Sequence, residues 1–488
     1  TVGINGLATV TGGNLTLTAT DAVSQTAAIT AGTLTVKTKK DGGAAITLPN
    51  NFNDVSTIDL RTRNTADTAN AAGAISYLDA TGFTVAAVST TSAVPLTLTA
   101  GGGITHPPAA AINAGGTVTL NVGASNIGSA SSIAGTIVSA GQVTVNGGNG
   151  ADILNVQLAT AHLGAAGLIF NGGIGSPNVL LITSKVGNNV YCVEEGSTST
   201  IFHGTAENQP YDAKLSYNSN VQKVQIDGNN SVDNVTVSVS NIQTPTQFWL
   251  NATAGKQSTL KIDAIGHTVQ KYAIGNLSAS TLAPDLVTST LVWNAGTNPF
   301  VPLRPGTTAL PLTVPQKFSI NNVALLQYFG GMGNDCVINN TSTNSLMVGG
   351  GGKATLVGGK GSNELLGGAG TSQLIGRGTV DYLLANYTVD YTGVVAPNNG
   401  ILKKLAVTNG NYIYDFPSGP GLSLVLYGSN DQHYTDIKVI LPQNSGKLTT
   451  LEWLKAVLWK TENIVKQAQS ASMLRKLPGC PDKLHFSG

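Results

Sequence analysis

The feature that most constrains the fold of this chain is a glycine-rich unit that recurs every nine residues. Successive units open at Gly349, Gly358, Gly367 and Gly376. Each unit ends in an apolar segment, such as Leu365-Leu366, and a related unit opens earlier, at Gly330. Glycine turns that separate short strands at a fixed period are typical of a parallel β-roll or solenoid. Residues 326–385 are therefore predicted to form a stack of short parallel strands.

A second repeat occupies residues 1–146, where apolar residues alternate with Thr or Ser, as in Leu15-Thr16-Leu17-Thr18. The leading apolar residues of these segments are Leu15, Leu34, Ile58, Phe83, Leu96, Val118 and Val143, at intervals of 19, 24, 25, 13, 22 and 25 residues. Apart from the half-step of 13 residues, each interval suits one coil of a right-handed parallel β-helix. The alternation places Leu, Val and Ile inside the coil and Thr or Ser on its outer surface.

Composition excludes several classes of protein. Charged residues make up 10% of the chain, against about 25% in ordinary soluble domains, and the net charge is +1. So small a charge creates no field that would attract nucleic acid, and no nucleic-acid partner is expected. Apolar residues reach 41%, which excludes a disordered chain, and the 59 glycines fit an all-β protein with many tight turns.

Three features bear on the compartment in which the protein works. No apolar run approaches the roughly 18 residues that span a bilayer, so no transmembrane segment is expected. The chain begins at Thr1 rather than Met, which fits a processed, exported form. The cysteines Cys192, Cys336 and Cys480 match no metal-binding spacing and allow at most one disulfide, with one thiol left over. We therefore expect an extracellular or cell-surface protein.

Two groups of residues carry a resemblance to known families. Residues 147–155, Gly-Gly-Asn-Gly-Ala-Asp-Ile-Leu-Asn, fit the haemolysin-type (RTX) calcium-binding nonapeptide at every defined position. The Gly/Thr-rich strings at residues 96–105 and 114–121 resemble filamentous-haemagglutinin-type β-helix surface proteins, and similar strings occur in large exported proteins of planctomycete-like bacteria. The resemblance implies a secreted β-helix protein with degenerate RTX-like repeats.

The nonapeptide raises the question of calcium, because its sixth position normally supplies a carboxylate. In the block after residue 330 this position is Asp335, Ala354, Asn363, Ser372 and Asp381. Loops on one side of a β-roll are two units, or 18 residues, apart, so Asn363 and Asp381 share a side and bring one carboxylate between them. Calcium takes about six to eight oxygen ligands. The sequence predicts either no cofactor or weakly bound calcium at Asp152, Asp335 and Asp381.

The predicted fold class is all-β, with parallel β-helix (β-solenoid) and β-roll segments, further β-regions and one C-terminal amphipathic helix. Six regions are expected: a solenoid at 1–146, a β-region with RTX-like turns at 147–241, a proline-punctuated β-region at 242–325, a degenerate RTX-like β-roll at 326–385, a C-terminal β-region at 386–446 and a helical tail at 447–488. The proline-dense segment 299–315 is the expected linker.

The predicted helix starts with a capping box, Thr449 as N-cap and Glu452 three residues later. Its apolar face includes Leu451, Leu454, Leu458 and Val465. This face is expected either to cover the end of the solenoid or to dock onto a neighbouring subunit or a cell-wall partner.

No constellation of catalytic residues is evident, and the chain is not predicted to be an enzyme. The densest polar segment contains Asp431, His433 and Asp436. These residues either form an acid/base pair or lie in an exposed loop between two strands.

The function predicted first is an exported structural protein of the cell surface that self-assembles into an extracellular filament or surface layer through solenoid ends. Its partner would be further copies of the same chain, as a homo-oligomer or polymer. A surface adhesin that binds cell-surface glycan is the first alternative. A β-helix polysaccharide-degrading enzyme that uses Asp431, His433 and Asp436 is the second.

Overall fold

The computed structural model describes most of the chain as far as residue 384. The described residues are 1–6, 8–91, 93–124, 129–139, 141–163, 166–195, 198–206, 210–239, 247–264, 269–276, 316–330, 334–349, 354–366, 372–375, 380–384, 406–408, 411–413, 422–427 and 438–440. Every regular element among them is a β-strand, so the described part of the chain is all-β, as predicted. It divides into two compact units, Thr1–Tyr191 with Ser197–Ser231 and Cys192–Gly196 with Val232–Gly488.

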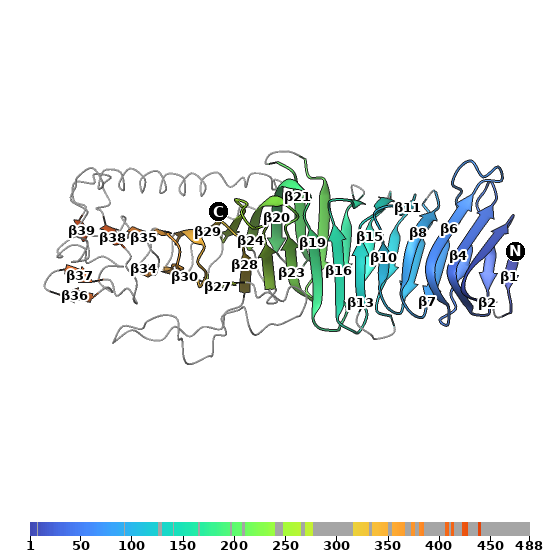
Figure 1. The fold of residues 1–488 in the computed structure, drawn as a ribbon, viewed down its shortest axis with the longest axis horizontal. Helices are drawn as coiled ribbons and strands as arrows, with labels where there is room; N and C mark the ends of the chain where they lie inside the picture. The colour runs from blue at the N-terminus through green and yellow to red at the C-terminus, as the bar shows by residue number, and fades with distance from the viewer. Residues whose placement is uncertain are drawn as a thin grey trace. The chain divides into compact units, whose positions relative to one another are not determined.

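The first unit is a parallel β-solenoid whose coils stack strand upon strand (blue to green in Figure 1). One of its two sheets, which we call sheet A, stacks β1 (Val2–Ile4), β3 (Val23–Gln25), β5 (Ile46–Leu48), β7 (Ile75–Asp79), β9 (Leu96–Ala100), β12 (Val118–Asn121), β15 (Val143–Asn146), β18 (Leu168–Asn171) and β22 (Ala213–Asn218). Each of these strands is parallel to the next.

The opposite sheet, sheet B, starts with long strands and continues with shorter pairs. Its strands are β2 (Ala8–Ala19), β4 (Ile29–Lys39), β6 (Asp54–Arg63), β8 (Phe83–Ser89), β10 (Ile104–His106), β11 (Ala111–Ala114), β13 (Ser129–Ile133), β14 (Thr136–Ser139), β16 (Asp152–Gln157), β17 (His162–Leu163), β19 (Asn178–Thr183) and β23 (Val221–Asp227). Strand β8 pairs with both β10 and β11. The break between them contains Pro107 and Pro108, which cannot donate to a strand ladder.

The register confirms the predicted coils and explains their irregular step. Val118, Val143 and Leu168 are partners on successive strands of sheet A, so these coils are each 25 residues long. The half-step between Phe83 and Leu96 is the passage from one sheet to the other, because Phe83 begins β8 in sheet B and Leu96 begins β9 in sheet A.

The core of the first unit lies between the two sheets. The expected inward residues are buried: Leu34 and Ile58, for example, are register partners with no exposed surface. The Thr residues that alternate with them keep partial exposure. Burial of a Leu or Ile side chain stabilises a fold by roughly 1.5–3 kcal/mol, so the repeated apolar stack is the main stabilising element.

An insertion interrupts the parallel stacking. The partners Leu168 and Leu215 lie 47 residues apart, instead of the 25 between Val143 and Leu168. The extra residues contain β20 (Gly187–Glu195) and β21 (Thr198–Gly204), and β21 runs antiparallel to β22.

The second unit repeats the two-sheet pattern. One sheet stacks β24 (Ser231–Val239), β26 (Thr259–Asp263), β29 (Leu325–Phe329), β31 (Asn344–Val348), β33 (Asn363–Leu366), β35 (Val380–Leu384) and β38 (Leu422–Tyr427) in parallel, and β39 (Lys438–Ile440) is antiparallel to β38. The other joins β25 (Gln247–Asn251), β28 (Gln316–Asn321), β27 (Val269–Asn276), β30 (Asn334–Asn339), β32 (Ala354–Val357) and β34 (Ser372–Ile375). A separate antiparallel pair is formed by β36 (Ala406–Thr408) and β37 (Asn411–Ile413).

The nonapeptide block forms the predicted β-roll with 18-residue coils. Ser345, Asn363 and Asp381 are register partners on one sheet, and Ala354 and Ser372 are partners on the other. Asp335 pairs with Ala354, which places it on the second side.

The boundary expected between residues 146 and 147 does not interrupt the strand pairing, because β15 pairs with β18 and β13 with β16. Cys192 is buried and disulfide-bonded. The segment 299–315 and the tail 447–488 lie outside the described residues. In the described part of the chain, no helix is long and apolar enough to cross a membrane.

Candidate functional site

The sixth-position aspartate of the complete nonapeptide, Asp152, is buried at a corner of the solenoid. One carboxylate oxygen accepts hydrogen bonds from Ser129 N at 3.2 Å and Ser129 Oγ at 2.6 Å. The other accepts one from Gly148 N at 2.8 Å. Ser129 lies one coil earlier, and Gly148 lies in the same nonapeptide turn. The carboxylate therefore joins two coils and closes its own turn.

The equivalent position in the second unit holds an amide with the same contacts. Asn363 Oδ1 accepts hydrogen bonds from Gly359 N at 2.9 Å and from Ser345 Oγ at 2.7 Å. Ser345 is the register partner of Asn363, as Ser129 is of Asp152. The Asn363 amide adds a bond from Nδ2 to Gly359 O at 2.9 Å. A neutral side chain thus performs the same structural role as the carboxylate.

Other corners use the same device without a nonapeptide. Ile29 N donates to Asn53 Oδ1 at 2.9 Å, and Asp152 N donates to Asn178 Oδ1 at 3.0 Å. In each case a buried polar side chain accepts an N–H group from the preceding coil. Buried backbone donors require such acceptors, so these side chains are structural at their corners.

The three predicted calcium-site aspartates lie on three different strands, one in the first unit and one on each sheet of the second. Asp152 lies in the first unit, in register with Ser129. In the second unit, Asp335 is buried on one sheet beside Ala354, and Asp381 is in register with Asn363 on the other sheet. Among the residues that the structure describes, no group of three His, Cys, Asp or Glu side chains could hold a metal ion.

The donors around Asp152 bear directly on metal binding. N–H and O–H groups that point at both carboxylate oxygens stabilise the anion without an ion. A calcium ion would have to displace these donors and still collect about six oxygen ligands. The geometry therefore suits a hydrogen-bonded corner rather than a cation site.

The outer face of sheet A carries a ladder of asparagines that sequence reasoning missed. Asn171 Nδ2 donates to Asn146 Oδ1 at 2.9 Å, and Asn146 Nδ2 donates to Asn121 Oδ1 at 2.9 Å. The ladder continues from Asn121 Nδ2 to Thr99 Oγ1 at 3.1 Å. The equal 25-residue spacing of the three asparagines is the sequence signal that could have revealed it.

Beside the asparagine ladder runs a row of hydroxyl side chains. Its members are successive register partners: Ser24, Thr47, Ser76, Thr97, Thr119 and Thr144. Parallel strands lie about 4.8 Å apart, so this row repeats a hydroxyl group at that interval. Together the row and the ladder form an uncharged, regularly spaced surface, which we call the sheet A grid.

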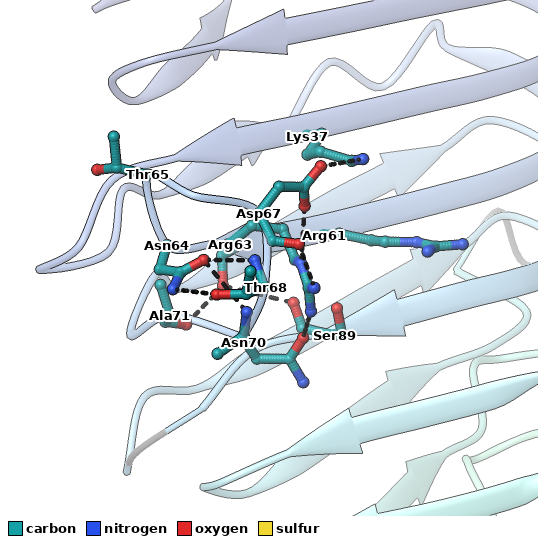
Figure 2. A network of polar contacts seen from close by, with 12 residues as sticks. Lys37, Arg61, Arg63, Asn64, Thr65, Asp67, Thr68, Asn70, Ala71 and Ser89 are labelled. Atoms are coloured by element: carbon teal, nitrogen blue, oxygen red, sulfur yellow. Dashed lines mark hydrogen bonds and ion pairs between the residues drawn. The ribbon is translucent and has the colours of Figure 1, made fainter.

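The outer face of sheet B is different, because it concentrates charge in a chain that has little. Lys37 is the register partner of Arg61, and Lys39 is the partner of Arg63. Like charges on neighbouring strands repel one another. Asp67 sits between the two strands and contacts both Lys37 Nζ at 2.9 Å and Arg63 Nε at 3.0 Å (Figure 2).

The loop that carries Asp67 is built for this contact. Asn64 Oδ1 accepts hydrogen bonds from Thr68 N at 2.8 Å and Ala69 N at 3.2 Å, which closes the loop on itself (Figure 2). Arg63 also donates to Asn70 Oδ1 at 2.6 Å. Hydrogen bonds from Lys37 and Arg63 hold the pKa of Asp67 below its usual value. Asp67 pairs with Lys37 and Arg63, and Asp59 pairs with Arg61 at 2.6 Å, so three of the four basic side chains are held in ion pairs, which indicates a stabilising network.

In the first described coil of the solenoid, β1 pairs with β3 and β2 pairs with β4. Leu15 and Leu17 keep partial exposure, whereas Leu34, the register partner of Leu15, is fully buried. Val2 and Val10 are 41% and 36% exposed. The first described coil, residues 2–19, therefore carries partly exposed apolar side chains.

The other predicted site residues lie outside the described part of the chain. These are the assembly residues Leu451, Leu454, Leu458 and Val465 and the polar segment with Asp431, His433 and Asp436. Both remain predictions.

Comparison with known proteins gives one match. A family model described as "Repeats of unknown function (DUF5649)" matches residues 2–61 and 69–128. These two segments contain the strands from β1 to β12 almost completely, so the family repeat coincides with coils of the solenoid. Searches of curated proteins and of solved structures gave no significant match.

Proposed function

We propose that this chain is an exported structural protein of the cell surface that assembles into a filament or surface layer through the ends of its solenoid. The observation that carries the proposal is the stack of parallel coils, in which each strand pairs with the equivalent strand of the next coil. Such stacking can continue with a coil of another copy, and Val2 and Val10 are exposed apolar side chains that could pack against one. A low net charge reduces the repulsion between copies.

The disulfide at Cys192 supports the exported location. Disulfides persist in oxidising compartments and are rare in the cytosol. The resemblance to filamentous-haemagglutinin-type and RTX-like proteins points the same way. Fractionation of the source cells, with the protein probed in the culture medium and on intact cells, tests this location. Recovery only from the cytosol would contradict it.

Assembly is tested by light scattering after size exclusion, together with negative-stain electron microscopy. The purified protein is expected to form particles larger than a monomer. The double variant Val2→Lys and Val10→Lys should be monomeric, because two charges in place of exposed apolar side chains oppose the packing of a coil from another copy. The matched control is Val138→Lys, since Val138 is 55% exposed on β14, a strand paired on both sides. A wild-type protein that stays monomeric at all concentrations would refute the proposal.

A second function, glycan-binding adhesion, is favoured by the sheet A grid. Uncharged hydroxyl and amide groups repeated at a fixed interval can hydrogen-bond to the hydroxyls of a neutral polysaccharide laid along the solenoid. Co-sedimentation with microcrystalline cellulose, chitin and curdlan tests this binding.

The grid variant for this assay is Thr119→Lys with Thr144→Lys, two register partners on sheet A. The control is Thr84→Lys with Thr105→Lys, two outward register partners on sheet B. Binding that is lost only in the grid variant supports adhesion. Equal loss in both variants, or no binding of the wild-type protein to any of the three polymers, excludes it.

A further inference from the structure

The chain contains several Asn-Gly pairs, a dipeptide that can modify itself. The backbone nitrogen of such a glycine, once it has lost its proton, can attack the side-chain carbon Cγ of the asparagine. Glycine permits this attack because it has no Cβ to hinder the approach and its backbone turns freely. The pairs are Asn5-Gly6, Asn146-Gly147, Asn149-Gly150, Asn171-Gly172, Asn399-Gly400 and Asn409-Gly410, of which the first four lie in the described part of the chain.

The pair at Asn146 begins within the asparagine ladder, where both reacting groups are held. Gly147 N, the nucleophile, donates a hydrogen bond to Asn171 O at 2.8 Å. The Asn146 amide donates to Asn121 Oδ1 and accepts from Asn171 Nδ2, each at 2.9 Å. Before Asn146 could react, the glycine nitrogen and the amide would both have to leave these hydrogen bonds, so the ladder protects the pair.

The next two pairs are held as well. Gly172 N donates to Asn218 Oδ1 at 3.0 Å, while the Asn171 amide stays bound to Asn146. The backbone of Gly150 is stacked closely against the following coil, because a Cβ added to Gly175 would lie 1.8 Å from Gly150 O. In these pairs too, the stacking of coils fixes the peptide that would have to turn toward the asparagine side chain.

The pair at Asn5 has a different setting. Asn5 and Gly6 lie between β1 and β2, and both are exposed. Among the described residues, nothing lies within 4 Å of a Cβ added to Gly6. Asn5 Oδ1 accepts a hydrogen bond from Thr26 Oγ1 at 3.1 Å. That bond draws electron density away from Cγ and stabilises the negative charge that develops on the oxygen during attack.

From this contrast we propose that Asn5 is a site of spontaneous modification to aspartate or isoaspartate, whereas the inner pairs are protected by the stacked coils. Gly6 N loses its proton to solvent and forms a bond to Asn5 Cγ. The bond from Cγ to Nδ2 then breaks, and ammonia leaves with a proton taken from solvent. Water opens the resulting cyclic imide at either carbonyl group, which gives aspartate or isoaspartate, and no oxidant or reductant takes part.

The product changes the first described coil in two ways. A carboxylate replaces a neutral amide in a chain whose net charge is only +1, and it does so in the coil that carries the exposed Val2 and Val10. Isoaspartate also routes the main chain through the side-chain carbon, directly after Ile4. Ile4 O accepts backbone hydrogen bonds from Thr26 N at 3.0 Å and from Ala27 N at 3.2 Å, so the altered main chain adjoins the contact with the second coil.

Peptide mass spectrometry on the full chain tests the proposal. The purified protein is incubated in heavy-oxygen water at mildly alkaline pH, so that only residues converted during the incubation carry the label. Fragmentation by electron transfer then assigns each site and separates isoaspartate from aspartate. Asn5 is expected to convert at least about tenfold faster than Asn146 or Asn171, because opening the ladder breaks about two hydrogen bonds. In guanidinium, which unfolds the chain, the inner pairs should convert about as fast as Asn5.

The variant Gly6→Ala supplies the matched control. The added Cβ hinders attack by the backbone nitrogen and meets no described neighbour, so the conversion of Asn5 should be lost over the same incubation. Asn146 should stay unconverted in the same sample, which shows that the variant is folded. The proposal is overturned if Asn5 in the folded protein converts no faster than Asn146 and Asn171, if Gly6→Ala converts at the wild-type rate, or if the inner pairs stay slow in guanidinium.

Discussion

His106 should make the solenoid acid-sensitive. It is the last residue of β10, just before the corner at Pro107 and Pro108, and its side chain is fully buried. Neither ring nitrogen makes a hydrogen bond of normal geometry within the described structure. Burial lowers the pKa of His106 from 6.5 to about 4, an effect that the backbone of Ala110 only partly opposes. The folded state therefore requires the neutral ring.

The sign and size of the effect follow from linkage. Because the folded pKa of His106 lies below its unfolded value, stability from this residue is complete above pH 6.5 and is lost as the pH falls through 4. With those two pKa values, protonation reduces the free energy of unfolding by about 2 kcal/mol at pH 5 and by roughly 3 kcal/mol below pH 4.

The assay compares the wild-type protein with His106→Leu, which fills the same apolar site without a titratable group. Urea unfolding at about pH 7 and about pH 5 gives the free energy of unfolding for each. The wild-type value should drop by about 2 kcal/mol more than that of the variant. In this interval most carboxyl groups remain ionised, so the difference reports the histidine. Equal pH dependence of the two proteins would refute the assignment of a buried neutral ring.

Three further predictions concern stability. The replacement Asp152→Asn should change the free energy of unfolding little and leave it independent of calcium. Asp152→Ala should reduce the free energy of unfolding by roughly 1–3 kcal/mol, because buried N–H donors lose their acceptor. If calcium stabilised the wild-type protein and not Asp152→Asn, this prediction would be contradicted. Gly173→Ala should reduce the free energy of unfolding by about 3 kcal/mol, because the added Cβ would lie 1.6 Å from Gly148 O. Gly42→Ala is the control and should be tolerated, because nothing lies within 4 Å of a Cβ added there. Asp67→Asn should lower the melting temperature near neutral pH. The difference from wild type should shrink as acid protonates Asp67, because the pKa of Asp67 is lower in the folded state than in the unfolded state. Melting curves that coincide at neutral pH would show that the charge cluster is dispensable.

Much of the architecture could be predicted from the sequence, because a solenoid is made of local repeats. The nine-residue glycine period required 18-residue coils, and Ser345, Asn363 and Asp381 pair at that spacing. The alternation of Thr with Leu or Val placed Leu34 and Ile58 in the core. Such patterns are legible because each coil contacts its neighbours at a nearly constant separation in the chain.

Contacts that depend on an insertion could not be predicted in the same way. His203, Asp212 and Asn189 meet only because the coil between Leu168 and Leu215 is enlarged and folds back antiparallel. No period in the sequence marks that reversal, and an isolated histidine in a strand gives no indication of its partners.

The nonapeptide shows why its sixth residue predicts a fold more securely than it predicts a metal ion. At both positions the side chain accepts hydrogen bonds from the N–H group four residues earlier in the turn and from a serine hydroxyl of the preceding coil, through two carboxylate oxygens at Asp152 and through Oδ1 alone at Asn363. What this geometry selects is an oxygen acceptor of the right length, and the amide meets that requirement as well as the carboxylate does. Negative charge is needed only for a cation. A chain can therefore exchange Asp for Asn along such a stack and keep every coil, so the glycine period persists in the sequence whether or not calcium is bound.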